Sequence, residues 1–325
     1  MRARLAALLL TLTMTSHAAS TFQNPVIPID FPDPFILNAG GTFYAYVTNN
    51  ASGQNVPVQT SKDLVHWTPS GDAMPDLANW TKPGLTWAPE VMRAGNTYLL
   101  YYTARDAASD KQCVGVASAQ SPAGPFVDRS PKALVCQADL GGTIDPSPFT
   151  DTNGKRYLLF KNDGNCCGQP THLYVQPLSA DGLKLTGKPT PLIVNDAPWE
   201  GHVVEAPTLH KQGGVYFLLY SGGAYDSDGY AVGYATAKRI TGPYTKFRGN
   251  PLVKSAGQVA GPGHQALVQD GAGQWWLAYH AWTVPLVGYP GGERSTRLDP
   301  IAFKNGQIVF GGVTTKPQRA PTPIK

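Results

Sequence analysis

A single glutamate has unusual surroundings in the stretch VVEAPTLHKQGGVYFLLYSGG, residues Val203 to Gly223. The whole chain has only four glutamates, and this one, Glu205, follows two valines and comes shortly before a proline and an apolar strand. A carboxyl group in such surroundings loses hydration, which raises its pKa and suits it to donating a proton. Glu205 is therefore a candidate general acid.

Two aspartates lie in similar short motifs. Asp33 is in DFPDPFIL and Asp145 is in TIDPSPF, and each comes directly before a proline. Proline fixes φ and lacks an N–H donor, which suits a strand that begins at the mouth of a channel and holds one side chain in place. Two carboxyls on either side of an acetal can hydrolyse it, because one donates a proton and the other activates water. A third carboxylate near the acid can raise the pKa of that acid by charge repulsion.

These roles give a hypothesis for three carboxyls and one indole. Glu205 is assigned as the general acid, Asp33 as the general base, and Asp145 as the group that modulates the pKa of the acid. Trp87, in TWAPEV, would stack on the face of a sugar. The alternative for an aspartate before proline is an ordinary turn or strand end, and the alternative for Trp87 is packing in the core.

A repeat of about sixty residues favours the catalytic roles of these residues over their ordinary structural roles. Five segments share a glycine followed by an aromatic or aliphatic strand, and their aligned aromatic residues are 54, 59, 59 and 60 positions apart. Such a period fits one four-stranded antiparallel blade, and 35 glycines and 29 prolines supply turns between short strands. The sequence predicts an all-β fold, a five-bladed β-propeller with its active site in the central channel. A two-sheet sandwich predicts no such period. The aligned residues are Tyr44, Tyr98, Tyr157, Tyr216 and Trp276.

The repeat places the candidate residues in one phase. The innermost strand of each blade should begin beside the axis, 11 or 12 residues before the aligned aromatic residue. Equivalent positions of successive blades face one another across the channel of a propeller. The sequence therefore predicts that residues far apart along the chain meet at the axis. The residues in this phase are Asp33, Trp87, Asp145, Glu205 and His264.

Together these motifs resemble glycoside hydrolase family 43, the five-bladed propeller glycosidases of clan F. The resemblance runs from about Asn24 to Phe310 and implies hydrolysis with inversion at the anomeric carbon. Base, modulator and acid would then be Asp33, Asp145 and Glu205. The matching pieces are FPDPFIL, TWAPEV, GTIDPSPFTDTNGKRYLLFK, VVEAPTL followed by YFLLYSGG, ITGPY and GPGHQALVQDGAGQWWLAYHAW.

The resemblance also implies further site residues. The arginine of the family that contacts sugar hydroxyls would be Arg294 in GGERSTRLDPIAF, with Arg297 as the alternative. No cofactor is expected for the chemistry. In some members a histidine in the GPGH position helps to hold a calcium or other ion on the axis, which would make His264 a metal-site residue. Phe31 is the candidate substrate-binding aromatic residue, and blade packing is its alternative. Other aromatic candidates for sugar subsites are Trp80, Trp199, Tyr225 and Trp282.

The expected substrate is a plant cell-wall oligosaccharide or polysaccharide. The runs YLLFKNDGNCCGQPTHLYVQPLSADG and PWEGHVVEAPTL look most like the exo-acting α-L-arabinofuranosidases that trim α-1,5-arabinan. An endo-arabinanase and a β-xylosidase are alternatives on the same scaffold, and the absence of an extra carboxy-terminal β-sandwich disfavours the xylosidase. A non-catalytic sugar-binding propeller is the alternative from a different class. A sialidase-like propeller is disfavoured because SKDLVHW, which faintly resembles the repeated aspartate boxes of those proteins, occurs only once. A fructan-cleaving propeller is disfavoured because the RDP and EC motifs expected of it are missing.

The chain begins like an exported protein. Residues 1–18 are predicted to be a signal peptide cleaved after Ala18, so the mature protein would be secreted, either extracellular or periplasmic. Residues 19–325 are predicted to form a single propeller domain, with about the last ten residues as a disordered tail. The net charge of +4 comes from scattered lysines and arginines, which argues against nucleic acid. No apolar run is long enough for a membrane span, and a monomer is the default expectation.

Four cysteines in an exported chain predict two disulfides. Of the three pairings, the favoured one joins Cys113 to Cys136 and joins the neighbours Cys166 and Cys167. A zinc site is the alternative, but no CxxC spacing occurs in the chain.

Overall fold

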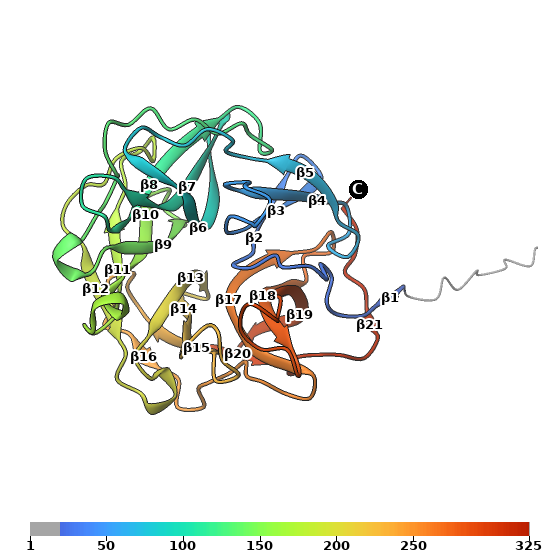
Figure 1. Cartoon of the computed structure of the whole chain (residues 1–325). Helices are drawn as coiled ribbons and strands as arrows, with labels where there is room; N and C mark the ends of the chain where they lie inside the picture. Colours follow the sequence, from blue (N-terminus) through green and yellow to red (C-terminus); the bar gives the residue numbers. More distant parts are fainter. Residues whose placement is uncertain (1–19, 325) are drawn as a thin grey trace, which may run out of the picture.

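The computed structural model describes residues 20–324, and it consists almost entirely of strands and turns. Five antiparallel sheets surround a central axis, as Figure 1 shows. This arrangement confirms the predicted five-bladed β-propeller. The predicted signal peptide lies outside the described residues. In the described part of the chain, no helix has both the length and the apolar character that a membrane crossing requires.

The strands of each blade follow one another in sequence order, starting with the strand nearest the axis. Blade 1 contains β2 (Phe35–Ala39), β3 (Thr42–Tyr46), β4 (Pro57–Ser61) and β5 (Thr68–Asp72). Blade 2 contains β6 (Thr81–Ala94), β7 (Thr97–Asp106) and β8 (Gln112–Ala119). Blade 3 contains β9 (Thr143–Thr150), β10 (Arg156–Asn162), β11 (His172–Pro177) and β12 (Thr190–Val194).

Blade 4 contains β13 (Val204–Gln212), β14 (Val215–Gly222), β15 (Ala231–Ala237) and β16 (Thr245–Lys246). Blade 5 contains β17 (Val259–Gln269), β18 (Trp275–Thr283), β19 (Ser295–Lys304) and β20 (Gln307–Phe310). Three short 3₁₀ helices lie in the loops: η1 (Ala138–Leu140), η2 (Gly164–Cys167) and η3 (Pro198–Glu200). The aligned aromatic residues of the repeat all fall in the second strand of their blade.

Blade 2 departs from the four-stranded pattern that the repeat predicts. Its sheet has three strands, and the following segment touches β8 only through three isolated bridges, Val127 to Ser118, Val135 to Val114 and Gly142 to Gln112. These separate bridges leave the outer edge of this blade less regular than that of its neighbours.

The hydrophobic core consists of five separate layers, each between two neighbouring blades. Strand β7 shows how the sequence produces this division. Its alternating residues point to opposite faces of the sheet, as in any strand. Leu100 and Tyr102 pack toward blade 1, whereas Leu99 and Tyr101 pack toward blade 3. A second strand that is apolar at every position, such as YLLYY, therefore supplies two layers at once.

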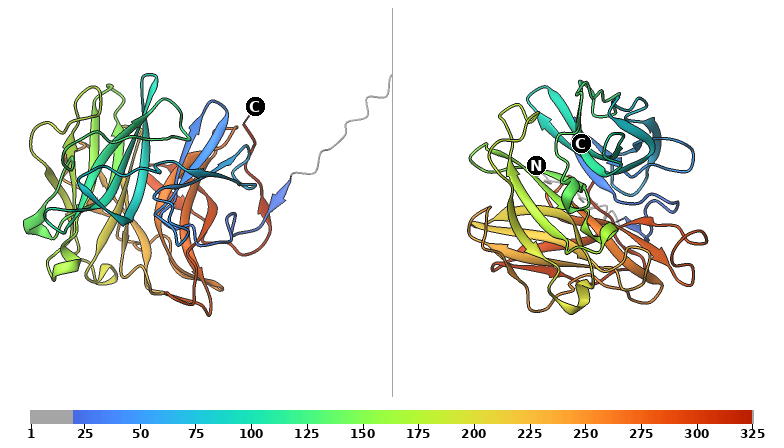
Figure 2. Two further views of the ribbon diagram at one scale, coloured as in Figure 1. Left: turned by 45° about the horizontal axis from the view of Figure 1, so that its top comes forward. Right: turned by 60° about the vertical axis from the view of Figure 1, so that its left-hand side comes forward.

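The two ends of the described chain pair with each other. β1 (Thr21–Phe22) forms an antiparallel pair with β21 (Gln318–Arg319) at the outer edge of the propeller, where Figure 2 shows the blue and red segments side by side. The predicted disordered tail is therefore wrong for residues 316–324. The backbone N–H of Ile324 donates to the carbonyl of Lys62, and its side chain packs on the layer between blades 5 and 1.

Deletion of residues 316–325 is expected to lower the midpoint of thermal unfolding by about 5 °C or more, because it removes β21 and exposes part of the layer that closes the ring. Differential scanning calorimetry measures the change. Thr322→Ala is the control, because the hydrogen bond of Thr322 to Asp270 uses only the backbone N–H. An unchanged midpoint in the deletion would show that the paired ends do not stabilise the propeller.

Candidate active site

One backbone feature recurs at the axis in all five blades. A residue other than glycine adopts a left-handed conformation within each inner strand or, in blade 1, two residues before it. In four blades the pairing register between the first and second strands shifts at this point, which marks a β-bulge. The bulge turns the local side chains toward the channel. The left-handed residues are Asp33 (φ 57°), Ala88 (φ 44°), Asp145 (φ 55°), Ala206 (φ 52°) and His264 (φ 47°).

A cavity of about 320 Å³ lies at the axis beside these bulges. All five blades contribute to its wall, and the predicted convergence of Asp33, Trp87, Asp145, Glu205 and His264 is observed. The complete lining is Asp33 and Thr48 from blade 1; Trp87 and Ala88 from blade 2; Ile144, Asp145, Lys161, Asp163, Asn165 and Cys166 from blade 3; Glu205, Tyr225 and Tyr230 from blade 4; and His264 and Arg294 from blade 5.

Asp33 is held as a carboxylate on one side of the cavity. Its Oδ1 lies 3.1 Å from Nη1 of Arg294 and 3.3 Å from Nδ1 of His264, and its Oδ2 accepts a hydrogen bond from Thr48. Burial alone would raise the pKa of this carboxyl, but Arg294, then His264 and His280, outweigh burial and hold the pKa well below its ordinary value. Asp33 is therefore ionised and able to accept a proton.

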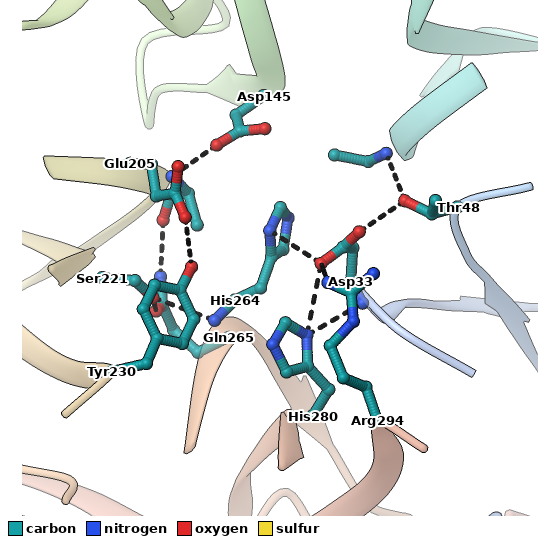
Figure 3. Close-up of polar contacts among 12 residues, drawn as sticks. Asp33, Thr48, Asp145, Glu205, Ser221, Tyr230, His264, Gln265, His280 and Arg294 are labelled. Carbon is teal, nitrogen blue, oxygen red and sulfur yellow. Dashed lines mark hydrogen bonds and ion pairs between the residues drawn. The ribbon is translucent and has the colours of Figure 1, made fainter. Parts of the chain in front are cut away.

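Two further carboxyl groups, those of Glu205 and Asp145, lie together on the opposite side of the cavity from Asp33, as Figure 3 shows. Oε2 of Glu205 lies 3.1 Å from Nζ of Lys161, and Oε1 accepts a hydrogen bond of 2.7 Å from the hydroxyl of Tyr230. Oδ2 of Asp145 accepts a hydrogen bond of 2.8 Å from the backbone N–H of Ala206, the residue after Glu205.

The pKa values within this pair differ from the sequence prediction. Burial, together with the nearby charge of Glu205, raises the pKa of Asp145 to about 6. Burial would also raise the pKa of Glu205, but the Lys161 ammonium outweighs it and lowers that pKa. The predicted rise for Glu205 is wrong for the free protein because a buried lysine stands beside it. The two carboxyls together hold one proton below about pH 6.

A model of the glycosyl hydrolases family 43 matches residues 22–308. The chain belongs to this family. A solved structure of a thermostable family-43 glycoside hydrolase superposes with a TM-score of 0.84 at 31% identity, covering 93% of this chain and 99% of that one. The protein is thus a family 43 glycoside hydrolase, and hydrolases of this family need no cofactor for their chemistry.

Three curated relatives of this family 43 hydrolase differ from one another in activity. An arabinoxylan arabinofuranohydrolase of Bacillus subtilis is 29% identical over 93% of this chain and 67% of its own length. An extracellular endo-α-(1→5)-L-arabinanase of the same species is 26% identical over 79% of this chain and 82% of its own. A β-xylosidase, also from Bacillus subtilis, is 28% identical over 79% of this chain and 49% of its own. Family membership alone therefore leaves the sugar open.

Two predicted substrate-binding residues of the hydrolase reach the cavity. Trp87 lines it from blade 2. Arg294 lines it from blade 5, and its guanidinium lies 4.9 Å from the ring centre of Tyr225 and 5.6 Å from that of Tyr289. The alternative, Arg297, is buried among other residues and donates to Thr283 instead. Of the further aromatic candidates for subsites, only Tyr225 belongs to the cavity wall of the described chain.

Phe31 does not line the cavity, so its predicted contact with substrate is wrong. The side chain is 3% exposed and packs with Ile27 and Ile36 in the layer between blades 5 and 1. Its backbone N–H donates to the carbonyl of Arg294, and its own carbonyl accepts from the hydroxyl of Thr296. Phe31 thus anchors the strand that carries the arginine.

His264 faces the carboxylate of Asp33 rather than a set of metal ligands. Its Nδ1 points at the same oxygen of Asp33 that Arg294 binds, so the charge of that carboxylate is already balanced by a cation. Within residues 20–324, no three histidine, cysteine, aspartate or glutamate side chains gather in a way that could hold a metal ion. The predicted ion at His264 does not fit these surroundings, and no step of the reaction is routed through it.

Both predicted disulfides are present in the hydrolase. Cys113 is bonded to Cys136, and Cys166 is bonded to its neighbour Cys167. The second bond belongs to the η2 turn, and Cys166 forms part of the cavity wall. The turn that carries this bond thus lies in the same cavity wall as Asp145 and Glu205.

Sequence reasoning missed a set of residues that approach the axis from the second strands. Lys161 contacts Glu205, and the imidazole of His280 contacts Asp33. Both follow the aligned aromatic residue of their blade by four positions, as Thr48 does in blade 1. The repeat therefore contains a second set of equivalent positions, four residues after each aligned aromatic residue, that could have identified them. Tyr230, which begins no recognisable motif, gave no such signal.

Proposed function

We propose that this protein is a secreted, inverting α-L-arabinofuranosidase that removes terminal arabinofuranosyl residues from α-1,5-arabinan or arabino-oligosaccharides. The observation that supports this most is the arrangement of a lone ionised carboxylate, Asp33, opposite a proton-sharing pair, Asp145 and Glu205, in one small cavity. The cysteine pairs and the amino-terminal segment support an oxidising destination outside the cytoplasm.

The proposed reaction is a single displacement at the anomeric carbon. Asp33 accepts a proton from a water molecule as the water oxygen forms a bond to that carbon. The bond from the carbon to the leaving oxygen breaks at the same time, and Glu205 donates a proton to this oxygen. Asp145 stays beside Glu205, and repulsion between the two carboxylates keeps one proton bound within the pair. Inversion requires the carboxyls of Asp33 and Glu205 to be roughly 6.5–9.5 Å apart, with room for the water.

Exo action is supported by the size of the cavity. About 320 Å³ is near the lower end of the roughly 300–1,000 Å³ found for ligand pockets. Such a space suits one sugar ring and part of the next better than a polymer running through it. Two relatives support arabinose as the released sugar: the arabinoxylan arabinofuranohydrolase and the endo-arabinanase of Bacillus subtilis.

The products released from debranched arabinan, arabinoxylan and xylo-oligosaccharides test the proposal. We expect arabinose as the only early product from debranched arabinan, and proton NMR during turnover should show the inverted anomer first. Early release of arabino-oligosaccharides would identify an endo-arabinanase, and release of xylose would identify a β-xylosidase. Binding of arabinan without any hydrolysis would indicate a sugar-binding propeller.

A further inference from the structure

A ring of hydrogen bonds joins neighbouring blades at the axis. In four of the five junctions, the backbone N–H of a left-handed residue donates to a side chain on the second strand of the preceding blade or just beyond it. Each acceptor is a hydroxyl or an imidazole. The four bonds are Ala88 to Thr48 (2.9 Å), Asp145 to Thr103 (3.2 Å), His264 to Ser221 (2.9 Å) and Asp33 to His280 (3.1 Å).

The junction between blades 3 and 4 is built differently. The equivalent position on β10 is Lys161, whose ammonium has no lone pair and cannot accept a hydrogen bond. The backbone N–H of Ala206 donates to Oδ2 of Asp145 instead, at 2.8 Å. At this junction the proposed catalytic carboxyl of Asp145 therefore replaces the second-strand side chain as the acceptor.

Lys161 is fully buried, and its ammonium is surrounded by acceptors. Nζ lies 3.1 Å from Oε2 of Glu205, 2.6 Å from Oδ1 of Asn165 and 3.9 Å from Oδ1 of Asp163. Burying an ammonium is costly unless it is paired, whereas a hydroxyl serves the same junction in other blades without that cost. A role in the ring alone therefore does not account for a lysine at this position.

We propose that Lys161 is a positioning residue that fixes the direction of the Glu205 carboxyl and decides which of the two neighbouring carboxyls, Glu205 or Asp145, holds their shared proton. The ammonium binds one oxygen of Glu205, and the hydroxyl of Tyr230 binds the other. Asp145, which lacks a cation at hydrogen-bond distance, stores the proton until a leaving group reaches Glu205. This inference rests on the proposed role of Glu205 as the general acid.

Lys161→Thr is the variant that tests this proposal, because threonine is the residue found at the same junction position in two other blades. The other charged or titratable groups around the pair are Glu90, Asp163, Tyr230 and His264. Loss of the ammonium removes the positive charge beside the two carboxyls, so the pair binds its shared proton more tightly. We expect the basic limb of the kcat/KM profile to move to higher pH by about one unit or more.

The leaving group gives a second measurement. In Lys161→Thr, kcat on arabinan should fall about tenfold or more, whereas hydrolysis of an aryl arabinofuranoside with a good leaving group should fall much less, since it needs little help from an acid. Lys211→Met is the matched control. Its ammonium forms an ion pair of 2.6 Å with Asp151 away from the cavity, so the basic limb should stay in place.

An unmoved basic limb in Lys161→Thr, or an equal loss with both leaving groups, would overturn the proposal. Lys161→Met provides a second variant if the threonine variant fails to fold. Glu205→Gln distinguishes a failure of the proposed function from a failure of the proposed role of Lys161. Full hydrolysis by Glu205→Gln would remove the proposed function itself, whereas loss of activity in Glu205→Gln with an unmoved limb in Lys161→Thr would remove only the role of Lys161.

Discussion

Glu205→Gln is expected to lower kcat on arabinan by about 100-fold or more, because the amide cannot donate the proton that the leaving oxygen needs. The amide keeps the size of the side chain and can still accept a hydrogen bond from Lys161 or Tyr230, so the cavity should retain its shape. Hydrolysis of an aryl arabinofuranoside with a strongly acidic phenol should fall far less. Steady-state kinetics with a series of phenols of different pKa measure this difference.

A residue that only maintained the cavity would behave differently. Its loss would lower the rates for all leaving groups by a similar factor, and it would also lower the midpoint of thermal unfolding. Glu200→Gln offers a comparison, since Glu200 is fully buried and also pairs with a lysine, Lys246, but does not line the cavity. Glu200→Gln should affect stability without any dependence on the leaving group.

Asp33→Asn is expected to lower kcat by roughly 100-fold to 10,000-fold for good and poor leaving groups alike, because every substrate needs the attacking water to lose its proton. Burial would raise the pKa of Asp33, but Arg294, with His264 and His280, holds it well below its ordinary value. The wild-type kcat/KM should therefore persist as the pH falls until the pH passes that low pKa.

The asparagine variant should lose this acidic limb, because the group that titrates there is gone. Its residual activity should be independent of pH on the acidic side, which pH-rate profiles of both proteins would reveal. Activity within about threefold of wild type would rule out Asp33 as the general base. A normal thermal midpoint would confirm that Arg294 and the two histidines tolerate the neutral amide.

The propeller and the meeting of its three carboxyls could be predicted because both depend on one period in the sequence. Asp33, Asp145 and Glu205 stand 11 or 12 residues before an aromatic residue of a second strand, and this spacing places them at the axis. The presence of two disulfides could also be predicted from the number of cysteines and the expected export of the chain. These features are repeated or counted, so a single sequence reveals them.

Other features depend on contacts that the period does not encode. The pKa of Glu205 was mispredicted because Lys161 lies in the apolar run YLLFKN, where nothing indicates which carboxyl the ammonium will meet. The predicted contact of Phe31 with substrate fails because its side chain packs in the layer between blades 5 and 1. The predicted tail is wrong because backbone hydrogen bonds to β1 and Gly271, distant in the sequence, fix the carboxy-terminal segment.

The division of the core into five layers has a consequence for how this scaffold diversifies. Each layer is shared by only two blades, so a change in the residues at the axis leaves the apolar contacts of the other layers intact. One blade can exchange a hydroxyl for a lysine, and another can present an indole, while the toroid remains closed. A mutation at the channel therefore perturbs at most the two apolar layers of its own blade, so the lining of the channel can be altered one blade at a time.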